Sequence, residues 1–181
     1  MKNKNIFEYF NHKRLPLFWA AAIAAIVSPW IIDFPGMSGE SGAEEICEVR
    51  SIYDGDTMTV KCRGERMKVR LYCIDAPEMK QRPWGKESRD YLLAITPKTV
   101  RILPKTKDRY GRTVAEVWTH DGDDIQENLN LAMVWAGRAV VYKNYCGEKI
   151  YFTAEANARR VKSGVWEKAG EQQNPWGWRK K

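Results

Sequence analysis

Apolar and polar residues alternate along much of the chain after residue 45, which is the pattern of strands with one buried face. The alternation predicts five strands, over residues 46–53, 57–62, 67–74, 98–103 and 111–118. Asp54-Gly55 separates the first two strands and is typical of a two-residue hairpin turn. A turn of that length pairs Tyr53 with Asp56 and places Cys47 opposite Cys62.

A spacing of three to four residues between apolar positions predicts three helices, over residues 83–95, 124–136 and 148–163. Asp124 and Glu127 form a capping-box-like pair at the start of the second helix, and Gly137 follows its end. Gly164 ends the third helix, whose predicted buried face consists of Ile150, Ala154, Ala158 and Val161. Five short strands and three helices favour an α+β fold that is mainly β, a five-stranded barrel of the OB type with helices packed outside.

The most apolar segment comes before the strands. Residues 15–32 contain 18 residues without a charge, and about 20 residues span a bilayer. The basic sequence HKR precedes this hydrophobic helix and an acidic linker follows it, so we expect the N-terminus inside and the remainder outside the cytoplasm. A buried core helix fits poorly because no charge interrupts the segment. It is either an uncleaved membrane anchor or a cleaved signal, for which Ser41-Gly42-Ala43 is the best cleavage site.

The net charge of +7 on 181 residues is concentrated at the two ends of the chain. Residues 1–14 carry about +3 and residues 179–181 carry +3, which leaves about +1 for the residues between them. A basic composition is therefore weak support for a polyanionic partner. Any such binding must come from a few well-placed arginines.

Four cysteines in an exported domain are candidates for disulfides. The predicted hairpin register favours a bridge between Cys47 and Cys62, although a hydrogen-bonded pair holds side chains less closely. The other two cysteines are Cys73 and Cys146. A zinc site is not expected, because no CxxC spacing occurs.

The candidates for chemistry are four acidic residues and two arginines: Asp54, Asp56, Asp75, Glu78, Arg70 and Arg112. Carboxylate oxygens suit Ca²⁺ or Mg²⁺, and a guanidinium group binds phosphate in a bidentate manner. An EF-hand loop is excluded, because Thr59 stands where its glycine is required. A cation, a carboxylate and an arginine clamp together suit phosphodiester hydrolysis. Taken singly, each motif has a plainer interpretation as a turn or a strand end.

The order of the motifs closely resembles the staphylococcal nuclease-like, or thermonuclease, family. The matching motifs are DGDT at 54–57, VRLYCIDAPE at 69–78, DRYGR at 108–112 and SGVW at 163–166. The resemblance covers residues 46–166, and the ending NPWGWRKK is similar to the tails of bacterial members. It implies a nuclease that binds DNA, RNA or both and requires Ca²⁺.

The resemblance also implies a role for each matching residue. The metal ligands fall on Asp56, Asp75 and the backbone carbonyl of Ala76. The catalytic residues fall on Arg70, Glu78 and Arg112, and the substrate-binding residues on Arg109, Tyr110 and Tyr142. Asp54 is expected to form the turn and to lie behind the metal ligands. The second Asp-Gly-Asp, at residues 121–123, is expected to be only a turn before a helix.

Two departures from the family pattern bear on the substrate. The loop after Glu78 is shorter than in the best-known member, and Arg109 replaces a lysine. Two alternatives to an active enzyme are a catalytically silent module that binds nucleic acid or a protein, and an anchored structural protein of the cell envelope. All five catalytic and metal-binding side chains are present, which favours the enzyme.

The sequence thus predicts a chain of five parts, acting as a monomer and attached to the membrane if it is not cleaved. They are a basic tail (1–14), the anchor or signal (15–32), a linker (33–45), the nuclease domain (46–166) and a Trp-rich basic tail (167–181).

Overall fold

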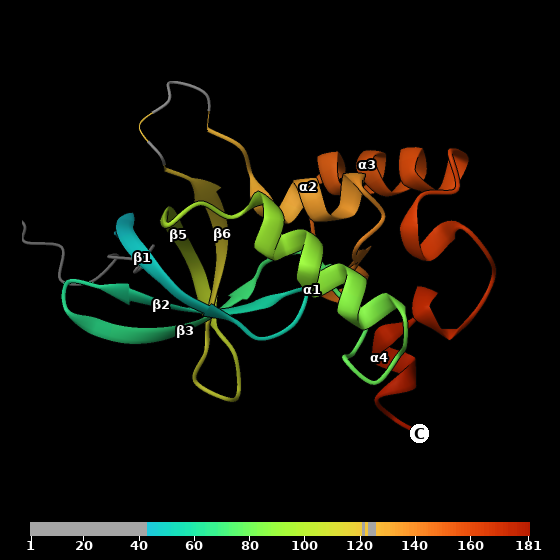
Figure 1. Ribbon diagram of the computed structural model, residues 1–181, viewed down its shortest axis with the longest axis horizontal. Coiled ribbons are helices and arrows are strands. Elements are labelled where there is room, and N and C mark those ends of the chain that lie inside the picture. The colour runs from blue at the N-terminus through green and yellow to red at the C-terminus, as the bar shows by residue number, and fades with distance from the viewer. Residues whose placement is uncertain (1–42, 121, 123–125) are drawn as a thin grey trace, which may run out of the picture. The chain divides into compact units, whose positions relative to one another are not determined.

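The computed structural model describes residues 43–120, 122 and 126–181, and these residues form a closed barrel with helices beside it (Figure 1). The hydrophobic segment 15–32 and Asp124 lie outside the described residues. Among the residues that are described, no helix has both the length and the apolar character that crossing a membrane requires.

Five strands close the barrel in the order β1-β2-β3-β6-β5. These strands are β1 (Glu45–Ile52), β2 (Thr57–Cys62), β3 (Glu65–Leu71), β5 (Thr99–Lys107) and β6 (Thr113–Thr119). All neighbours are antiparallel except β3 and β6, which run parallel and complete the closure. The predicted five-stranded barrel with external helices is therefore confirmed.

The interior of the barrel is filled by the alternating apolar residues that predicted the strands. Their side chains are 0–1% exposed: Met58, Val60, Val69, Leu71, Val100, Ile102, Ala115 and Val117. Burial of these side chains of β2, β3, β5 and β6 removes apolar surface from water, which is the main favourable contribution to folding.

The first hairpin has a longer turn than the sequence predicts. Val49 pairs with Val60 as expected, but a β-bulge shifts the register so that Ser51 lies opposite Thr59. The Tyr53 amide donates to the carbonyl oxygen of Thr57 at 3.0 Å, so the turn contains three residues, 54–56. The predicted pairing of Tyr53 with Asp56 was wrong, because the bulge adds one residue to the β1 side of the pair.

The third strand also ends earlier than predicted. Cys73 has a φ of +68°, which few residues other than glycine adopt, and β3 stops at Leu71. The chain turns there into the short strand β4 (Ile74–Asp75), which pairs with β7 (Val140–Val141) outside the barrel. This turn gives the DAPE motif a position beside the barrel.

Three main helices lie beside the barrel, α1 (Trp84–Ile95), α2 (Leu129–Trp135) and α3 (Lys149–Arg160). The predicted start of α2 was wrong: Asn128 is its cap and accepts the Leu131 amide hydrogen at 3.0 Å, whereas Glu127 precedes the helix. The predicted buried face of α3 was partly wrong, since Ile150 and Val161 are more than half exposed. The buried residues of α3 are Tyr151, Ala154, Glu155 and Ala158.

The remaining elements are short and were not predicted from the periodicity. They are the 3₁₀ helices η1 (Lys143–Tyr145), η2 (Gly164–Trp166) and η3 (Glu171–Gln173), and the helix α4 (Pro175–Trp178).

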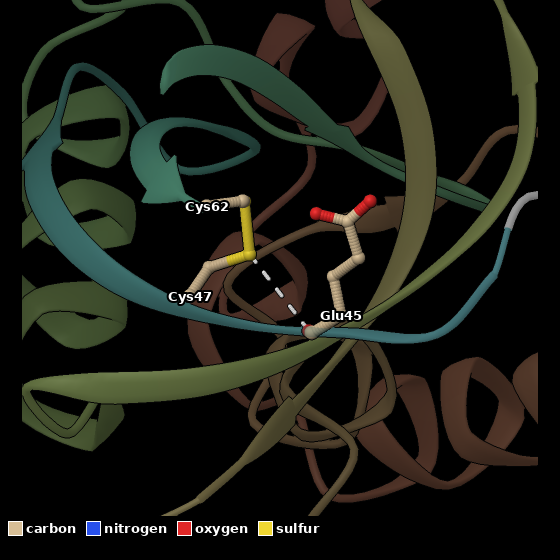
Figure 2. A group of neighbouring side chains, drawn as sticks. All are labelled: Glu45, Cys47 and Cys62. Carbon is tan, nitrogen blue, oxygen red and sulfur yellow. Dashed lines mark hydrogen bonds between the residues drawn. A yellow bond between two sulfur atoms is a disulfide. The ribbon is translucent and has the colours of Figure 1, made fainter. Parts of the chain in front are cut away.

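Two disulfides connect segments that are distant in the sequence. Cys47 and Cys62 are bridged, as the hairpin register predicted, and their Cα atoms are 4.5 Å apart, the spacing of a non-hydrogen-bonded pair (Figure 2). Cys73 and Cys146 form the second bridge, between the end of β3 and the segment before α3. Glu45 lies near the first bridge. The sulfur atoms of Cys47 and Cys62 are bonded to each other, so they are not thiolate ligands for a metal.

A buried asparagine on α2 joins the helix to the parallel strand pair. Asn130 is 0% exposed, and its Nδ2 donates to the carbonyl oxygens of Tyr72 and Ala115 at 2.9 and 3.0 Å. Its Oδ1 accepts the Val117 amide hydrogen at 2.9 Å. These bonds satisfy backbone groups at the place where β3 and β6 meet.

We expect Asn130→Leu to lower the free energy of unfolding by about 2–4 kcal/mol, because buried backbone groups then lose their partner. The measurement is chemical denaturation of the purified variant. Asn144→Ala, at an exposed position, is the control and should change the stability by less than about 0.5 kcal/mol. Equal stability of the two variants would contradict the role of Asn130.

Candidate active site

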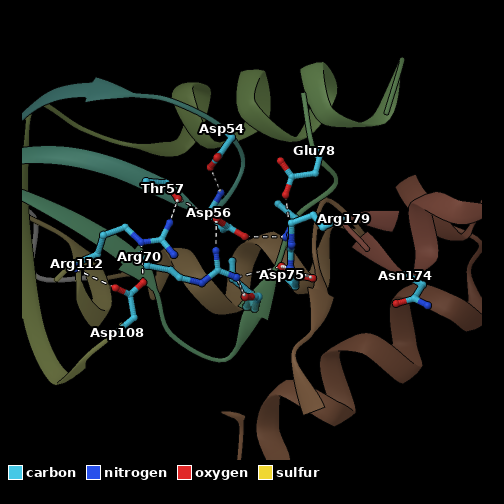
Figure 3. Close-up of polar contacts among 12 residues, drawn as sticks. Asp54, Asp56, Thr57, Arg70, Asp75, Glu78, Asp108, Arg112, Asn174 and Arg179 are labelled. Atoms are coloured by element: carbon cyan, nitrogen blue, oxygen red, sulfur yellow. Dashed lines mark hydrogen bonds and ion pairs between the residues drawn. The ribbon is translucent and has the colours of Figure 1, made fainter. Parts of the chain in front are cut away.

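The turn between β1 and β2 is held against α1 by a glycine. A Cβ atom on Gly55 would lie 1.8 Å from Oγ of Ser88 and 2.8 Å from Cβ of Ala76, so only glycine fits there. Asp54 Oδ1 accepts the amide hydrogen of Asp56 at 3.1 Å, which fixes the turn. The turn therefore presents Asp56 toward β4, as Figure 3 shows.

Arg70, in the motif VRLYCIDAPE, connects two of the four matching motifs, its own and DGDT. Its Nη1 donates to Oδ1 of Asp56 at 2.9 Å, and its Nη2 donates to Oδ1 of Asp75 at 3.0 Å (Figure 3). Asp56 and Asp75 are 3% and 1% exposed. The amide of Ala76 donates to Oδ2 of Asp56 at 3.0 Å. Burial lowers the pKa of Arg70, but the charges of the two aspartates outweigh it, so the net shift is upward.

Glu78 lies three residues beyond Asp75 and has an unexpected partner. Arg179, in the C-terminal tail, donates through Nη1 to Oε1 of Glu78 at 2.7 Å. Its Nη2 lies 2.8 and 3.0 Å from the two carboxylate oxygens of Asp75. Burial lowers the pKa of Arg179, but its hydrogen bonds and the charges of Glu78 and Asp75 outweigh burial, so the net shift is upward. No role for this arginine was predicted from the sequence.

Arg112 is held by the tight turn between β5 and β6. Asp108 accepts the backbone amides of Tyr110 and Arg112 through Oδ1, at 2.9 and 3.0 Å, and Arg112 Nε through Oδ2 at 2.7 Å. Burial raises the pKa of Asp108, but these hydrogen bonds outweigh it and lower the pKa. Nη1 of Arg112 lies 3.5 Å from Oγ1 of Thr57, which itself donates to Asp56 at 3.0 Å. Arg112 is thus linked to the carboxylates through one threonine.

A groove of about 1220 Å³ runs over these residues. Five aromatic residues contribute to its lining, namely Tyr72, Tyr110, Tyr142, Tyr145 and Trp176. Arg109 and Arg112 lie over the Tyr110 ring at 4.8 and 5.6 Å from its centroid. Cations and aromatic faces in one groove suit a phosphate backbone with stacked bases.

The acidic groups of the site repel one another. Burial raises the pKa of Asp54 to about 7, and the neighbouring charges of Asp56 and Glu78 add to the shift. Burial and the charge of Asp56 also raise the pKa of Asp75, although Arg179 and Arg70 oppose the rise. Clustered carboxylate oxygens, with the pKa values of Asp54 and Asp75 raised, suit a hard divalent cation such as Ca²⁺. Asp56, Asp75 and the carbonyl of Ala76 are the groups that would hold it.

The structure brings together every residue that the resemblance selected. Arg70 bonds to Asp56 and Asp75, and the Ala76 amide bonds to Asp56. Glu78 is joined to Asp75 through Arg179, and Arg112 is joined to Asp56 through Thr57. Arg109, Tyr110 and Tyr142 line the same groove. Sequence reasoning missed Arg179 and Asp108. Asp108 was within a quoted motif, and Arg179 was within the NPWGWRKK ending.

Comparison with known proteins defines the class. Residues 68–168 match the family model of the staphylococcal nuclease homologues. An uncharacterized endonuclease of Haemophilus influenzae is 38% identical over 143 residues, which are 78% of this chain and 77% of that protein. A micrococcal nuclease of Shigella flexneri is 36% identical over 169 residues, covering 89% of this chain and 90% of that protein. The thermonuclease of Staphylococcus hyicus is 33% identical over 132 residues, covering 68% and 76%.

The chain belongs to the staphylococcal nuclease family. It is a nuclease, a hydrolase of the phosphodiester bonds of nucleic acid.

We expect Asp108→Asn to lower the melting temperature near pH 7 and to have less effect as the pH falls toward 3. The pKa of Asp108 is lower in the folded protein than its ordinary 3.8, so its stabilisation is present above that value and is lost as pH falls through the folded pKa. The measurement is thermal unfolding from pH 3 to 7. Asp90→Asn, which removes a single exposed ion pair with Lys86, is the control and should have the smaller effect. A difference between wild type and Asp108→Asn that does not depend on pH would contradict the prediction.

Proposed function

We propose that the chain is a Ca²⁺-dependent endonuclease that works outside the cytoplasm. The observation that carries the proposal is the pair of buried carboxylates, Asp56 and Asp75, bridged by Arg70 beside Glu78 in a groove lined by cations and aromatic rings. The names of the relatives, endonuclease, micrococcal nuclease and thermonuclease, support the same reaction.

The proposed mechanism assigns one task to each side chain. Asp56, Asp75 and the carbonyl of Ala76 would hold Ca²⁺, whose positive charge would stabilise the negative charge of the phosphate. Arg70 and Arg112 donate hydrogen bonds to the phosphate oxygens, whose negative charge rises as the attacking oxygen approaches. Glu78 accepts a hydrogen bond from the attacking water and orients it, and it is the group placed to take the proton.

The groove residues position the strand on either side of the bond that is cut. Arg109 provides a cation for a neighbouring phosphate, and the exposed ring of Tyr110 provides a face for a base. Tyr142 lies beneath Arg70, whose guanidinium carbon is 5.9 Å from the ring centroid, and so limits where the phosphate sits. All these residues belong to one chain, so we propose that the monomer is active.

We expect Glu78→Gln and Arg112→Ala each to lower the rate of nucleic acid cleavage by more than about tenfold. Loss of a general base costs about 10²–10⁴ in rate, and loss of one preorganised donor costs about 10²–10³. The measurement is degradation of plasmid and single-stranded DNA. EDTA should abolish cleavage and Ca²⁺ should restore it. The exposed Glu65→Gln and Arg160→Ala are matched controls that should retain wild-type rates. A near-normal rate in either site variant, with an unchanged melting temperature, would refute the assignment.

The proposal of a location outside the cytoplasm rests on two independent features. The charge-free segment 15–32 follows basic residues, which favours export of what comes after it. The two disulfides suit an oxidising compartment. The membrane holds the protein through residues 15–32 if that segment is retained.

We expect the full-length chain, expressed in a bacterium, to be recovered in the membrane or periplasmic fraction with both disulfides formed. The measurements are fractionation, non-reducing peptide mapping and N-terminal sequencing. A chain that begins near Glu44 would identify a cleaved signal, and retention of residue 15 an anchor. Recovery in the cytoplasm with free thiols would contradict export.

A further inference from the structure

The C-terminal tail reaches back into the site across most of the domain. Arg179 is 101 residues from Glu78 and 104 residues from Asp75 in the sequence, yet it hydrogen-bonds to both carboxylates at 2.7–3.0 Å. Its guanidinium group lies between a proposed metal ligand and the proposed water-orienting carboxylate (Figure 3).

An ordered segment presents this arginine. Asn174 caps α4 by accepting the Gly177 amide hydrogen at 3.0 Å, and the buried Pro175 opens the helix.

Two glutamines attach the preceding part of the tail to the domain. The buried Gln172 donates to the carbonyl oxygen of Val165 at 3.2 Å. Gln81, in the loop after Glu78, donates to the carbonyl oxygen of Glu171 at 3.1 Å. The tail is thereby fixed to the same loop that carries Glu78.

Arg179 uses the oxygen atoms that a cation would need. Oδ1 of Asp75 accepts hydrogen bonds from Arg70 and Arg179, and Oδ2 accepts from Arg179. A divalent cation ligated by Asp75 competes for the same lone pairs and repels the guanidinium group. The three observed hydrogen bonds take most of the roughly four lone-pair sites of Asp75, so a metal ion and Arg179 compete for this carboxylate.

We propose that Arg179 is a further functional residue of the site, a built-in cation that holds Asp75 and Glu78 in position until a divalent cation displaces it from Asp75. This inference rests on the proposed function, because it takes Asp75 as a metal ligand. Arg179 then sets the Ca²⁺ concentration at which the site fills. The exchange couples metal binding to the position of the tail that forms part of the groove.

The neighbouring lysine provides a matched control. Lys180 carries the same charge on the same tail, and its Nζ lies 3.5 Å from the centroid of the Trp176 ring. Among the described residues, no ion pair joins Lys180 to a carboxylate. Lys180→Gln therefore reports the general effect of removing one positive charge near the site, and Arg179→Gln reports the effect of the specific contacts.

The test is isothermal titration of Ca²⁺ into the full chain without nucleic acid, in about 0.1 M salt, where exposed charges are screened beyond about 10 Å. We expect Arg179→Gln to bind Ca²⁺ about tenfold more tightly than wild type, the size of effect that loss of charged hydrogen bonds gives. Lys180→Gln should change the affinity less than about twofold. Arg179→Lys retains the charge without the bidentate fork and should fall between wild type and Arg179→Gln.

The outcomes separate this inference from the proposed function. If wild type binds Ca²⁺ and Arg179→Gln binds it no more tightly, or if Lys180→Gln gains as much, the role of Arg179 is wrong and the metal site stands. If neither wild type nor any variant binds Ca²⁺, the calcium assignment fails and this inference fails with it. Melting temperatures show whether each variant is folded. If Arg179→Gln does not fold, the Ca²⁺ affinity of Arg179→Lys decides whether Arg179 has the proposed role.

Discussion

The arrangement of the site depends on one partly buried guanidinium group, that of Arg70. Arg70 lies on β3, and its two terminal nitrogens bond to Asp56 in the β1–β2 turn and to Asp75 on β4. Removing one partner of a buried ion pair leaves an uncompensated charge, which costs about 3–5 kcal/mol. The two acidic segments are therefore held in place by the same residue whose charge suits phosphate. Catalytic and structural demands cannot be separated at this position.

The barrel and its helices make that contact possible. Parallel pairing of β3 with β6 places the turn that carries Arg112 beside β3, and Asn130 satisfies backbone groups where β3 and β6 meet. The sharp turn at Cys73 directs Asp75 away from the barrel, and the bridge from Cys73 to Cys146 fixes that turn to the segment following Tyr142. Distances of about 3 Å at the site thus depend on closure of the whole barrel.

Local signals predicted much of this fold, and contacts over long sequence distances account for what they missed. Strict alternation of apolar residues located the strands, since a slip of one residue would expose Val60 or Val69. The same alternation continued through Cys73 and concealed the end of β3, because a positive φ leaves no mark in the hydrophobic pattern. The start of α2 was misplaced because Asp124 with Glu127 fits the capping pattern as well as Asn128 does. Residue chemistry selected the acidic residues and the two arginines of the site, and family resemblance assigned their roles and added the substrate-binding residues.

Arg179 shows where sequence reasoning stops at a site of this kind. Four carboxyl groups meet in a small volume, and burial together with the charges of Asp56 and Glu78 raises the pKa of Asp54. Such a cluster requires positive charge before any metal arrives, and Arg70 can reach only two of its members. The remaining charge comes from the far end of the chain, because a tail can approach the open side of the groove that the barrel strands leave accessible. An arginine that supplies this positive charge can come from any place in the sequence. The spacing between Arg179 and the carboxylates therefore carries no signal, and the contact is visible only in the folded chain.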